Sequence, residues 1–391
     1  MTDQPTDQPS AFAEFQNEVY LKGLFGEQPT LPFGWREVEA AAREVMTPEA
    51  VGYVYGGAGG EETMRANREA FDRWRIVPRM LRGIPAKRDL TTTLLGTPMA
   101  APVLLAPVGV LSIVHPDGEL AVARAAASLG LTMCASTAAS YPMEEIAAQA
   151  PDAHRWYQLY WPADRDLAAS FVLRAEAAGY EALVLTLDTW QLGWRPRDLD
   201  AAYLPFLQSI GIANYLTDPV FQRDLPEGDT GAAVLKFVGL FNNPALTWDD
   251  LAWLRAQTSM PVVLKGVQHP DDVRRAQDAG VQAVVCSNHG GRQVDGAVGS
   301  LDVLPALVEA AGDLPVLFDS GVRSGADVVK ALALGAAAVL LGRPFVHGLA
   351  LAGEEGVRHV LRCLLADLDL QAGLSGHAAL AELSSSSLAR T

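Results

Sequence analysis

Eight short apolar runs recur between residues 102 and 341, and this repetition constrains the fold more than any other feature of the sequence. The runs span Pro102–Leu105, Leu131–Cys134, Arg155–Leu159, Ala182–Leu187, Pro261–Lys265, Ala283–Cys286, Pro315–Phe318 and Ala338–Leu341. Their apolar character is continuous rather than alternating. Continuous runs are typical of strands that are buried on both faces of a parallel sheet.

Alanine-rich helical stretches separate these runs and predict a repeated β/α unit. The clearest are 119–129, 164–178, 270–279, 302–311 and 324–334. A glycine follows four of the helical stretches, where a left-handed residue commonly ends a helix. These glycines are Gly130, Gly179, Gly280 and Gly335. Eight such units favour an α/β fold of the (β/α)8 TIM-barrel type over an open doubly wound sheet, because no Gly-x-Gly-x-x-Gly motif follows an early strand.

The chain of 391 residues is expected to form a single domain, 1–391, with two segments outside the barrel pattern. Residues 1–100 predict an N-terminal helical cap, with a helical stretch over 36–51, before a barrel over 101–375. Residues 194–247 follow the fourth strand and contain Pro, Gly and aromatic residues. A connection this long predicts an active-site lid with short helices of its own. The serine run Ser384–Ser387 predicts a frayed tail.

Charge and composition exclude several classes of protein. The formal net charge is −16, which repels nucleic acids and anionic membrane surfaces. The three cysteines are far apart and suggest neither a disulfide framework nor a zinc site. No secretory signal and no run of about 18 apolar residues is evident. We therefore expect a cytoplasmic protein with no nucleic-acid partner, no membrane partner and no metal.

Polar and ionisable residues gather where the predicted strands end, and active sites of such barrels lie at these ends. The first end carries Pro107, Val108 and Gly109, which let a flat ligand approach the backbone. The other ends carry Ser136, Gln158, Tyr160, Thr186, Asp188, Lys265, Ser287, His289, Arg292, Asp319, Gly321, Arg323, Gly342 and Arg343. This shared position predicts an active site.

Lys265 and the combination of Asp188 with His289 carry the clearest chemistry. An unpaired ammonium is costly to bury, so a lysine at the end of a buried strand favours a functional role. Asp188 could simply cap the next segment. Because it shares a face with His289, however, a carboxylate–imidazole pair is favoured, and such a pair orients a general base.

The last two strand ends indicate a phosphate site. Gly321 and Gly342 offer approachable backbone, while Arg323 and Arg343 offer bidentate guanidinium contacts. A purely structural arginine pair is the alternative. One phosphate, the buried Lys265 and several polar side-chain edges together describe flavin mononucleotide, FMN.

Four further side chains suit the other ligand of such a site. Arg195 and Arg292 are expected to face the open side of the flavin, together with the phenols of Tyr53 and Tyr160. Two guanidinium groups can clamp a carboxylate, and a phenol can hydrogen-bond a hydroxyl group. With a base beside them, these groups suit an α-hydroxy carboxylate.

Several motifs, taken together, resemble one known family. Ser287-Asn288-His289-Gly290-Gly291-Arg292-Gln293 resembles the signature of the FMN-dependent L-2-hydroxy acid dehydrogenase/oxidase family. Gln158-Leu159-Tyr160, Thr186-Leu187-Asp188-Thr189, Leu264-Lys265-Gly266 and Gly342-Arg343-Pro344 match in the same order. The resemblance runs from about residue 35 to about residue 375. Gly109, the segment 187–199 and the lid segment 214–221 resemble the lactate 2-monooxygenase branch of the family.

The resemblance implies a role for each candidate residue. His289, paired with Asp188, would be the base, and Tyr160 would hydrogen-bond the substrate hydroxyl. Arg195, Arg292 and Tyr53 would bind the carboxylate. The flavin would be contacted by Pro107, Val108, Gly109, Ser136, Gln158, Thr186, Lys265, Ser287, Asp319, Gly321, Arg323, Gly342 and Arg343, of which Arg323 and Arg343 would hold the phosphate.

The implied activity is FMN-dependent oxidation of a small L-2-hydroxy acid, in the first instance L-lactate, with O2 as acceptor. Acetate, CO2 and water would form in a monooxygenase, and pyruvate with hydrogen peroxide in an oxidase. The lid between Asp224 and Leu246 is shorter than in the monooxygenase branch, and Asp295-Gly296 resembles the oxidases, so both outcomes stay open. A quinone-linked dehydrogenase and a non-catalytic flavin barrel are further alternatives. The family also implies a homo-tetramer or homo-octamer.

Overall fold

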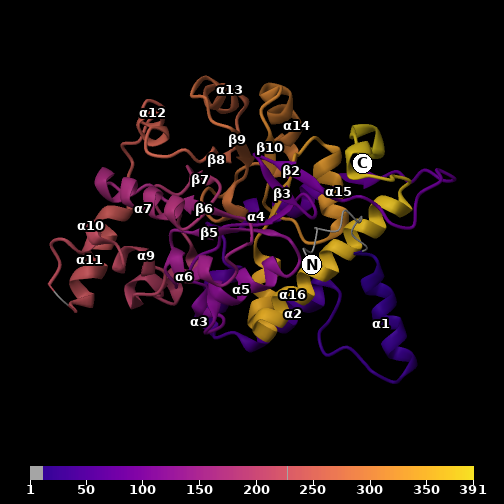
Figure 1. The fold of residues 1–391 in the computed structure, drawn as a ribbon, viewed down its shortest axis with the longest axis horizontal. Coiled ribbons are helices and arrows are strands. Elements are labelled where there is room, and N and C mark those ends of the chain that lie inside the picture. The colour runs from indigo at the N-terminus through magenta and orange to yellow at the C-terminus, as the bar shows by residue number, and fades with distance from the viewer. Residues whose placement is uncertain (1–11, 227) are drawn as a thin grey trace, which may run out of the picture.

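Eight parallel strands form a closed barrel, as the sequence predicts (Figure 1). The computed structural model describes residues 12–226 and 228–391. The barrel strands are β4 (Val103–Leu105), β5 (Thr132–Ser136), β6 (Arg155–Leu159), β7 (Leu183–Thr186), β8 (Val262–Val267), β9 (Ala283–Cys286), β10 (Val316–Phe318) and β11 (Val339–Leu341). They follow one another around the barrel in chain order, and β11 closes it by pairing with β4. Each predicted run provides one strand.

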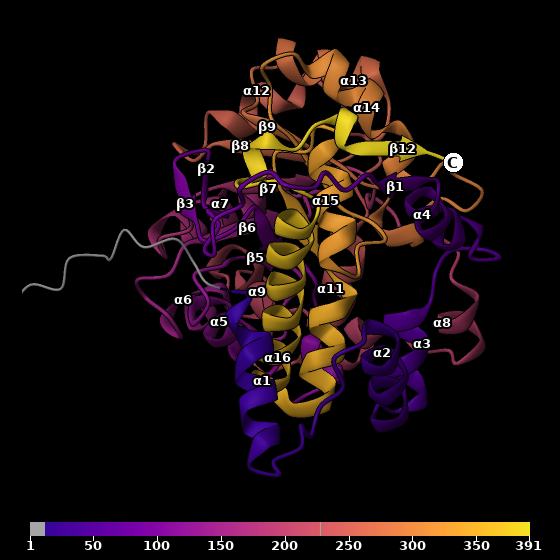
Figure 2. The same cartoon turned by 90° about the vertical axis from the view of Figure 1, so that its right-hand side faces the viewer.

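Helices alternate with these strands and cover the outside of the barrel (Figure 2). They are α5 (Gly118–Ala127), α6 (Met143–Ala148), α7 (Arg165–Ala177), α12 (Asp250–Arg255), α13 (Pro270–Asp278), α14 (Ser300–Ala311), α15 (Gly325–Ala333) and α16 (Arg343–Leu374). The four glycines predicted to end helices all have positive φ. The long α16 is interrupted at Ala352 and Gly353, where the backbone is not helical.

A two-stranded hairpin closes the amino end of the barrel. It consists of β2 (Thr92–Leu94) and β3 (Thr97–Met99). Leu94 and Met99 are buried in the same cluster as inward-facing strand residues such as Leu104. The indole of Trp156 in β6 donates a hydrogen bond to Thr97 Oγ1 at 3.1 Å. Because this end is plugged, the carboxyl end is the one available for a site.

The N-terminal region is less uniformly helical than predicted. It contains α1 (Glu14–Leu24), α2 (Trp35–Val45), α3 (Pro48–Tyr55) and α4 (Glu62–Asp72), followed by β1 (Trp74–Ile76) and the hairpin. The helical stretch expected over 36–51 divides at Thr47. Thr47 is extended and is the N-cap of a new helix that begins at Pro48. Its side chain accepts a hydrogen bond from the Ala50 N–H. The cap therefore combines helices with three short strands.

The prediction of a frayed tail at Ser384–Ser387 is wrong. Residues Leu388–Arg390 form β12, which pairs antiparallel with β1. Ser387 anchors this end, since its carbonyl accepts a hydrogen bond from the Val77 N–H and its hydroxyl contacts His377 Nε2 at 3.0 Å. A run of serines carries no local pattern that reveals such a distant strand partner.

Short helices form the segment predicted as a lid, which lies at the left of Figure 1. They are α8 (Pro196–Asp200), α9 (Ala213–Leu216), α10 (Pro219–Gln222) and α11 (Thr230–Phe241). An aromatic cluster holds α9, α10 and α11 together; its buried members are Phe206, Tyr215, Phe221, Phe237 and Phe241. Asn214 joins this segment to the barrel, because its amide donates hydrogen bonds to the carbonyls of Ser136 and Thr137.

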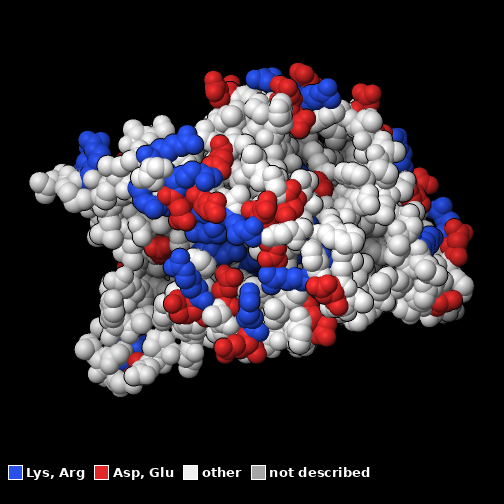
Figure 3. Space-filling model, turned by 180° about the vertical axis from the view of Figure 1, so that it is seen from behind, with Lys and Arg blue, Asp and Glu red and all other residues white. Residues whose placement is uncertain are grey.

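The surface combines charges of both signs. Figure 3 shows basic side chains near the centre of one face with acidic side chains among them. None of the helices in the described residues is both long enough and apolar enough to cross a bilayer.

A buried ion pair between Arg88 and Asp369 connects the N-terminal region to α16. Asp369 is 1% exposed and also accepts a hydrogen bond from the Ala13 N–H. We predict that Asp369→Ala lowers the free energy of unfolding by about 3–5 kcal/mol, because the buried guanidinium loses its partner. Urea unfolding measures the change. As a control, Asp271→Ala breaks the exposed Arg274–Asp271 pair and is expected to cost less than about 1 kcal/mol. Equal losses in the two variants would contradict the prediction.

Candidate active site

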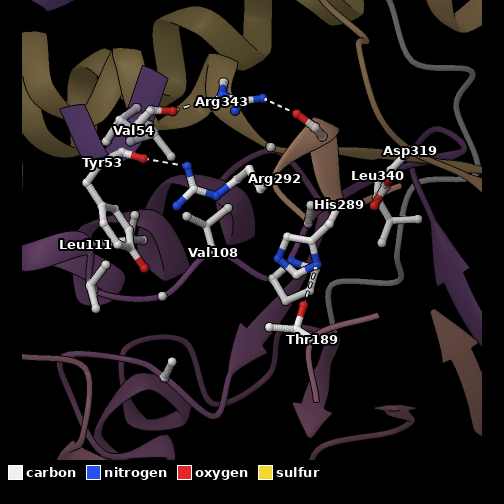
Figure 4. Close-up of a pocket in the computed structure, with 18 of the residues that line it drawn as sticks. Tyr53, Val54, Val108, Leu111, Thr189, His289, Arg292, Asp319, Leu340 and Arg343 are labelled. Atoms are coloured by element: carbon white, nitrogen blue, oxygen red, sulfur yellow. Dashed lines mark hydrogen bonds between the residues drawn. The ribbon is translucent and has the colours of Figure 1, made fainter. Parts of the chain in front are cut away.

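A pocket opens at the carboxyl ends of the barrel strands (Figure 4). It encloses about 1160 Å³, including space that is open to solvent. The predicted residues that line it are Tyr53, Pro107, Val108, Gly109, Tyr160, Arg195, Lys265, His289, Arg292, Asp319, Gly321, Arg323, Gly342 and Arg343. A pocket of this size, with mixed polar and apolar walls, suits a cofactor together with a small ligand.

The other predicted flavin contacts are not part of this lining. Ser136, Gln158, Thr186 and Ser287 are all buried. The Ser136 hydroxyl donates to Gln158 Oε1 at 2.9 Å. Among the described residues, the buried Gln158 Nε2 has no hydrogen-bond partner. An unpartnered buried donor is costly, so it indicates where an acceptor atom of a ligand belongs.

The structure brings His289 and Asp188 together. His289 Nδ1 lies 2.8 Å from Asp188 Oδ1. The Thr189 hydroxyl lies 3.1 Å from the same nitrogen (Figure 4). Because the carboxylate faces Nδ1, this nitrogen carries the proton and Nε2 is left as the basic atom. His289 has a φ of 58°, an unusual value for a residue other than glycine. Such strain at a functional residue is held in place by the surrounding structure.

Electrostatics favour a neutral imidazole beside an ionised carboxylate. Burial lowers the pKa of His289, and the charges of Lys265 and Arg195 lower it further against the opposing effect of Asp188. Burial by itself would raise the pKa of Asp188. The hydrogen-bonded His289 and the Lys265 ammonium outweigh burial and lower this pKa to about 2. A neutral imidazole paired with a carboxylate can accept a proton at neutral pH.

Two arginines and two tyrosines surround the space in front of His289. Arg292 donates to the carbonyls of Tyr53 and Gly56 at 2.6 and 2.7 Å, and its guanidinium lies 4.8 Å from the centre of the Tyr53 ring. Arg195 is 5% exposed, and burial together with the charge of Arg292 lowers its pKa to about 10. Burial raises the pKa of Tyr160 well above its usual value, so this phenol stays protonated. Such a group of donors suits a small carboxylate.

Lys265 is buried in an ion pair with Asp319 at 3.0 Å, a contact that the sequence does not predict. Its ammonium also donates to the Ser287 hydroxyl at 3.1 Å. Burial alone would lower the pKa of Lys265, but Asp319 and Asp188 outweigh burial and raise it. The lysine therefore stays charged, and Asp319 is partly committed to it.

Arg323 and Arg343 also line the pocket, but their bonding differs. Arg343 donates to the carbonyls of Val54, Gly290 and Gly56, two of which are seen in Figure 4. Within the described residues, the Arg323 guanidinium donates a hydrogen bond to the Val322 carbonyl at 2.9 Å, and its ion pair with Glu39 is long, at 3.7 Å. Burial and the charges of Arg292 and Arg323 lower the pKa of Arg343 to about 9. A phosphate would relieve this repulsion, so the residues present fit the phosphate end of FMN.

Gly109 and Gly57 have packing reasons for lacking a side chain. A Cβ added at Gly109 would lie 2.4 Å from the Ala138 carbonyl oxygen. One added at Gly57 would lie 2.4 Å from Met64 Sδ. At Gly342, by contrast, the nearest atom would be 3.9 Å away, so this glycine leaves open space. Gly342 therefore fits a backbone that a ligand approaches closely.

Sequence reasoning missed several residues of the pocket. Thr189 appears in a family motif without a predicted role, although it contacts His289. The lid contributes Phe206 and Phe241 to the lining, and Leu192, just before the lid, also lines the pocket. Nothing in the sequence ties these apolar residues to the pocket, because their position depends on how the lid folds back. The described residues contain no group of three potential metal ligands.

Comparison with known proteins places the chain in a family. The sequence profile of the family described as FMN-dependent dehydrogenase matches residues 42–390. An FMN-dependent alpha-hydroxy acid dehydrogenase of Penicillium citrinum is 44% identical over 376 residues, which cover 94% of this chain and 93% of the relative. An L-lactate oxidase of Lysinibacillus sphaericus is 41% identical over 360 residues, covering 92% and 93%.

A solved structure agrees with these relatives. A lactate oxidase of Pediococcus acidilactici superposes with a TM-score of 0.84 at 34% identity, covering 93% of this chain and 96% of that one. The family profile and these similarities together assign the chain to one family. The chain is a member of the FMN-dependent dehydrogenase family, a flavin-dependent 2-hydroxy acid oxidoreductase whose cofactor is FMN.

Proposed function

We propose that the protein oxidises a small L-2-hydroxy acid, with L-lactate as the first candidate, and that O2 is the electron acceptor. The observation that carries the proposal is the position of the His289–Asp188 pair beside two arginines in one pocket. Relatives named L-lactate oxidase and 2-hydroxyacid oxidase support the substrate class. A cytoplasmic location and a homo-tetrameric or homo-octameric assembly stay predictions from the sequence.

In the proposed mechanism, Arg195 and Arg292 bind the substrate carboxylate, assisted by Tyr53. The Tyr160 phenol donates a hydrogen bond to the substrate oxygen at the carbon that is oxidised. His289 Nε2 accepts the proton that the substrate loses, and Asp188 stabilises the imidazolium that results. This carboxylate cannot compete for the proton, because its own pKa is held near 2.

FMN, when bound, would be the two-electron acceptor, and the electrons would then pass to O2. We propose that Arg323 and Arg343 hold its phosphate, with the backbone at Gly321 and Gly342. Lys265 would supply positive charge to the flavin ring, while Asp319 would reach the ribityl chain. The ring edges would meet Pro107, Val108, Gly109, Ser136, Gln158, Thr186 and Ser287.

The way the lid is seated supports the monooxygenase outcome, in which acetate, CO2 and water are the products. A Cβ added at Gly211 would lie 2.3 Å from Val110 Cγ1 and 3.0 Å from the Ala138 carbonyl oxygen, so the lid backbone is pressed against two loops of the pocket. If pyruvate and peroxide stay together beneath this lid, they react to give acetate, CO2 and water. The second candidate is release of pyruvate and H2O2, which the relatives named oxidase favour.

We predict that the purified protein with L-lactate and O2, without catalase, forms acetate and CO2 in equal amounts and leaves little peroxide. Chromatography of the acids and a peroxide assay measure the products. Equal amounts of pyruvate and H2O2 would instead support the oxidase. Slow reoxidation in air would favour an electron carrier as the natural acceptor, a reading suggested by the relatives named dehydrogenase. No oxidation of any 2-hydroxy acid would refute the proposal.

His289→Gln is expected to lower the rate of substrate-dependent flavin bleaching by about 10²- to 10⁴-fold, because the proton acceptor is lost. In the wild type, kcat/KM should rise with pH as the imidazole loses its proton. The midpoint should lie below the ordinary value of 6.5, because burial, Lys265 and Arg195 lower the pKa of His289. Rapid-mixing absorbance and pH profiles measure both effects. An active His289→Gln variant that keeps FMN would contradict the role of His289.

Arg323→Met is expected to weaken FMN binding by about 10- to 100-fold, because charge-assisted hydrogen bonds to a phosphate are lost. Binding of riboflavin, which has no phosphate, should hardly change. Fluorescence titration of the apoprotein with each flavin gives the ratio of affinities. Arg274→Met serves as a control, because Arg274 is exposed and does not line the pocket. An unchanged preference for FMN in Arg323→Met would show that Arg323 does not bind the phosphate.

A further inference from the structure

Gln293 follows Arg292 directly, and the proposed mechanism gives it no role. Its side chain is half-buried, and both of its polar atoms are fully used. The amide Nε2 donates to the carbonyl of Asp188 at 2.7 Å and to the carbonyl of Gln191 at 2.8 Å. The amide oxygen accepts from Arg195 Nη2 at 2.7 Å and from the Gly193 N–H at 3.3 Å.

These hydrogen bonds join the loop after β9 to the segment that leads from β7 into the lid. The two segments touch so closely that glycine is needed at position 193. A Cβ added there would lie 2.7 Å from the carbonyl oxygens of both Arg292 and Gln293. The Gln293 amide thus bridges two groups by hydrogen bonds, the backbone carbonyl of Asp188 and the guanidinium of Arg195. Asp188 is the residue that pairs with His289.

Arg195 has few other restraints on its orientation. Its Nε donates to the Arg292 carbonyl at 3.0 Å, and Nη2 donates to Gln293. These two contacts fix the guanidinium plane and leave Nη1 and one hydrogen of Nη2 for a ligand. Asp198 offers a competing position, because its carboxylate is 4.0 Å from Nη1 and its buried Oδ1 has no hydrogen-bond partner in the described part of the chain.

The charge of Arg292 also favours displacement of Arg195. This charge, together with burial, lowers the pKa of Arg195, which means that the two guanidinium groups repel each other. Without the Gln293 oxygen, rotation of Arg195 toward Asp198 would reduce the repulsion and shorten the 4.0 Å ion pair between these two residues. The Gln293 oxygen therefore keeps Arg195 pointing into the pocket.

We propose that Gln293 is a positioning residue that holds Arg195 in the orientation required to bind the substrate carboxylate. The inference rests on the proposed function, since it takes Arg195 as a ligand of that carboxylate. It assigns to Gln293 an effect on affinity for the carboxylate, and neither proton transfer nor a contact with FMN.

The test is Gln293→Met, which keeps the length of the side chain and removes all four hydrogen bonds. Because the binding lost is common to the ground state and the transition state, KM for L-lactate should rise by about 10- to 100-fold while kcat falls less than about threefold. The Kd of pyruvate, read from the visible spectrum of the holoenzyme, should rise by a similar factor. The Kd of pyruvamide, which lacks the negative charge, should change little.

Gln268→Met is the matched control. Gln268 lies just after β8, and in the described part of the chain its amide donates one hydrogen bond, to the Val298 carbonyl at 3.3 Å. This variant should behave like the wild type in both KM and Kd. If Gln293 merely ties two loops together, Gln293→Met should lower the melting temperature and affect pyruvate and pyruvamide equally, which would overturn the proposal.

A double-mutant cycle keeps the inference testable even if Gln293→Met is less stable. Arg195→Met should weaken pyruvate binding, and adding Gln293→Met to it should cause no further loss, because Gln293 acts through Arg195. Additive losses would overturn the proposal. Failure of the proposed function would be seen in the wild type, as absence of both turnover and pyruvate binding. Failure of the present inference alone would leave the wild type active.

Discussion

Burying several cations in one pocket is the constraint on which the rest of the site depends. The formal charge of the protein is −16, yet Arg195, Arg292, Arg323, Arg343 and Lys265 all line the same pocket. Buried positive charges repel each other and lose hydration, so each needs an arranged partner. Lys265 has Asp319, and Arg343 and Arg292 have backbone carbonyls. The positive charge that these partners do not neutralise favours the binding of anions. FMN and a hydroxy carboxylate are both anions.

The carbonyl partners require unusual backbone. His289, Gly290 and Gly291 have positive φ in succession, which turns the Gly290 carbonyl toward Arg343 and leaves His289 Nδ1 facing Asp188. Gly193 allows the lid segment to approach this turn. His289, Arg195, Arg292, Arg343 and the start of the lid are therefore parts of one hydrogen-bonded unit, and Gln293 occupies its centre. Under the proposed function, a change in this unit would affect substrate binding even where it touches no substrate atom.

The sequence was sufficient for the elements whose pattern is local. Each barrel strand is buried on both faces and therefore appears as an apolar run, and the ends of these strands located the site because parallel strands share one carboxyl edge. Expectations that depended on distant partners were less successful. Ser384–Ser387 was expected to fray, yet the tail pairs with β1, over 300 residues earlier in the chain. The Lys265–Asp319 pair and the commitment of Arg343 to three carbonyls were likewise missed, because both depend on the approach of separate loops.

The sequence by itself determined the (β/α)8 class, the residue types at the strand ends and the family of the protein. Those properties follow from hydrophobic periodicity and from contiguous motifs, and both can be recognised in the sequence alone. Only the tertiary structure decided which donors are already occupied and which remain for a ligand. It showed that Arg343 is bonded to three backbone carbonyls whereas the Arg323 guanidinium is bonded to one in the described residues. It paired Ser136 with Gln158 and connected Gln293 to Arg195. The reason is physical, since a hydrogen bond depends on distances of about 3 Å between atoms that the chain order does not relate.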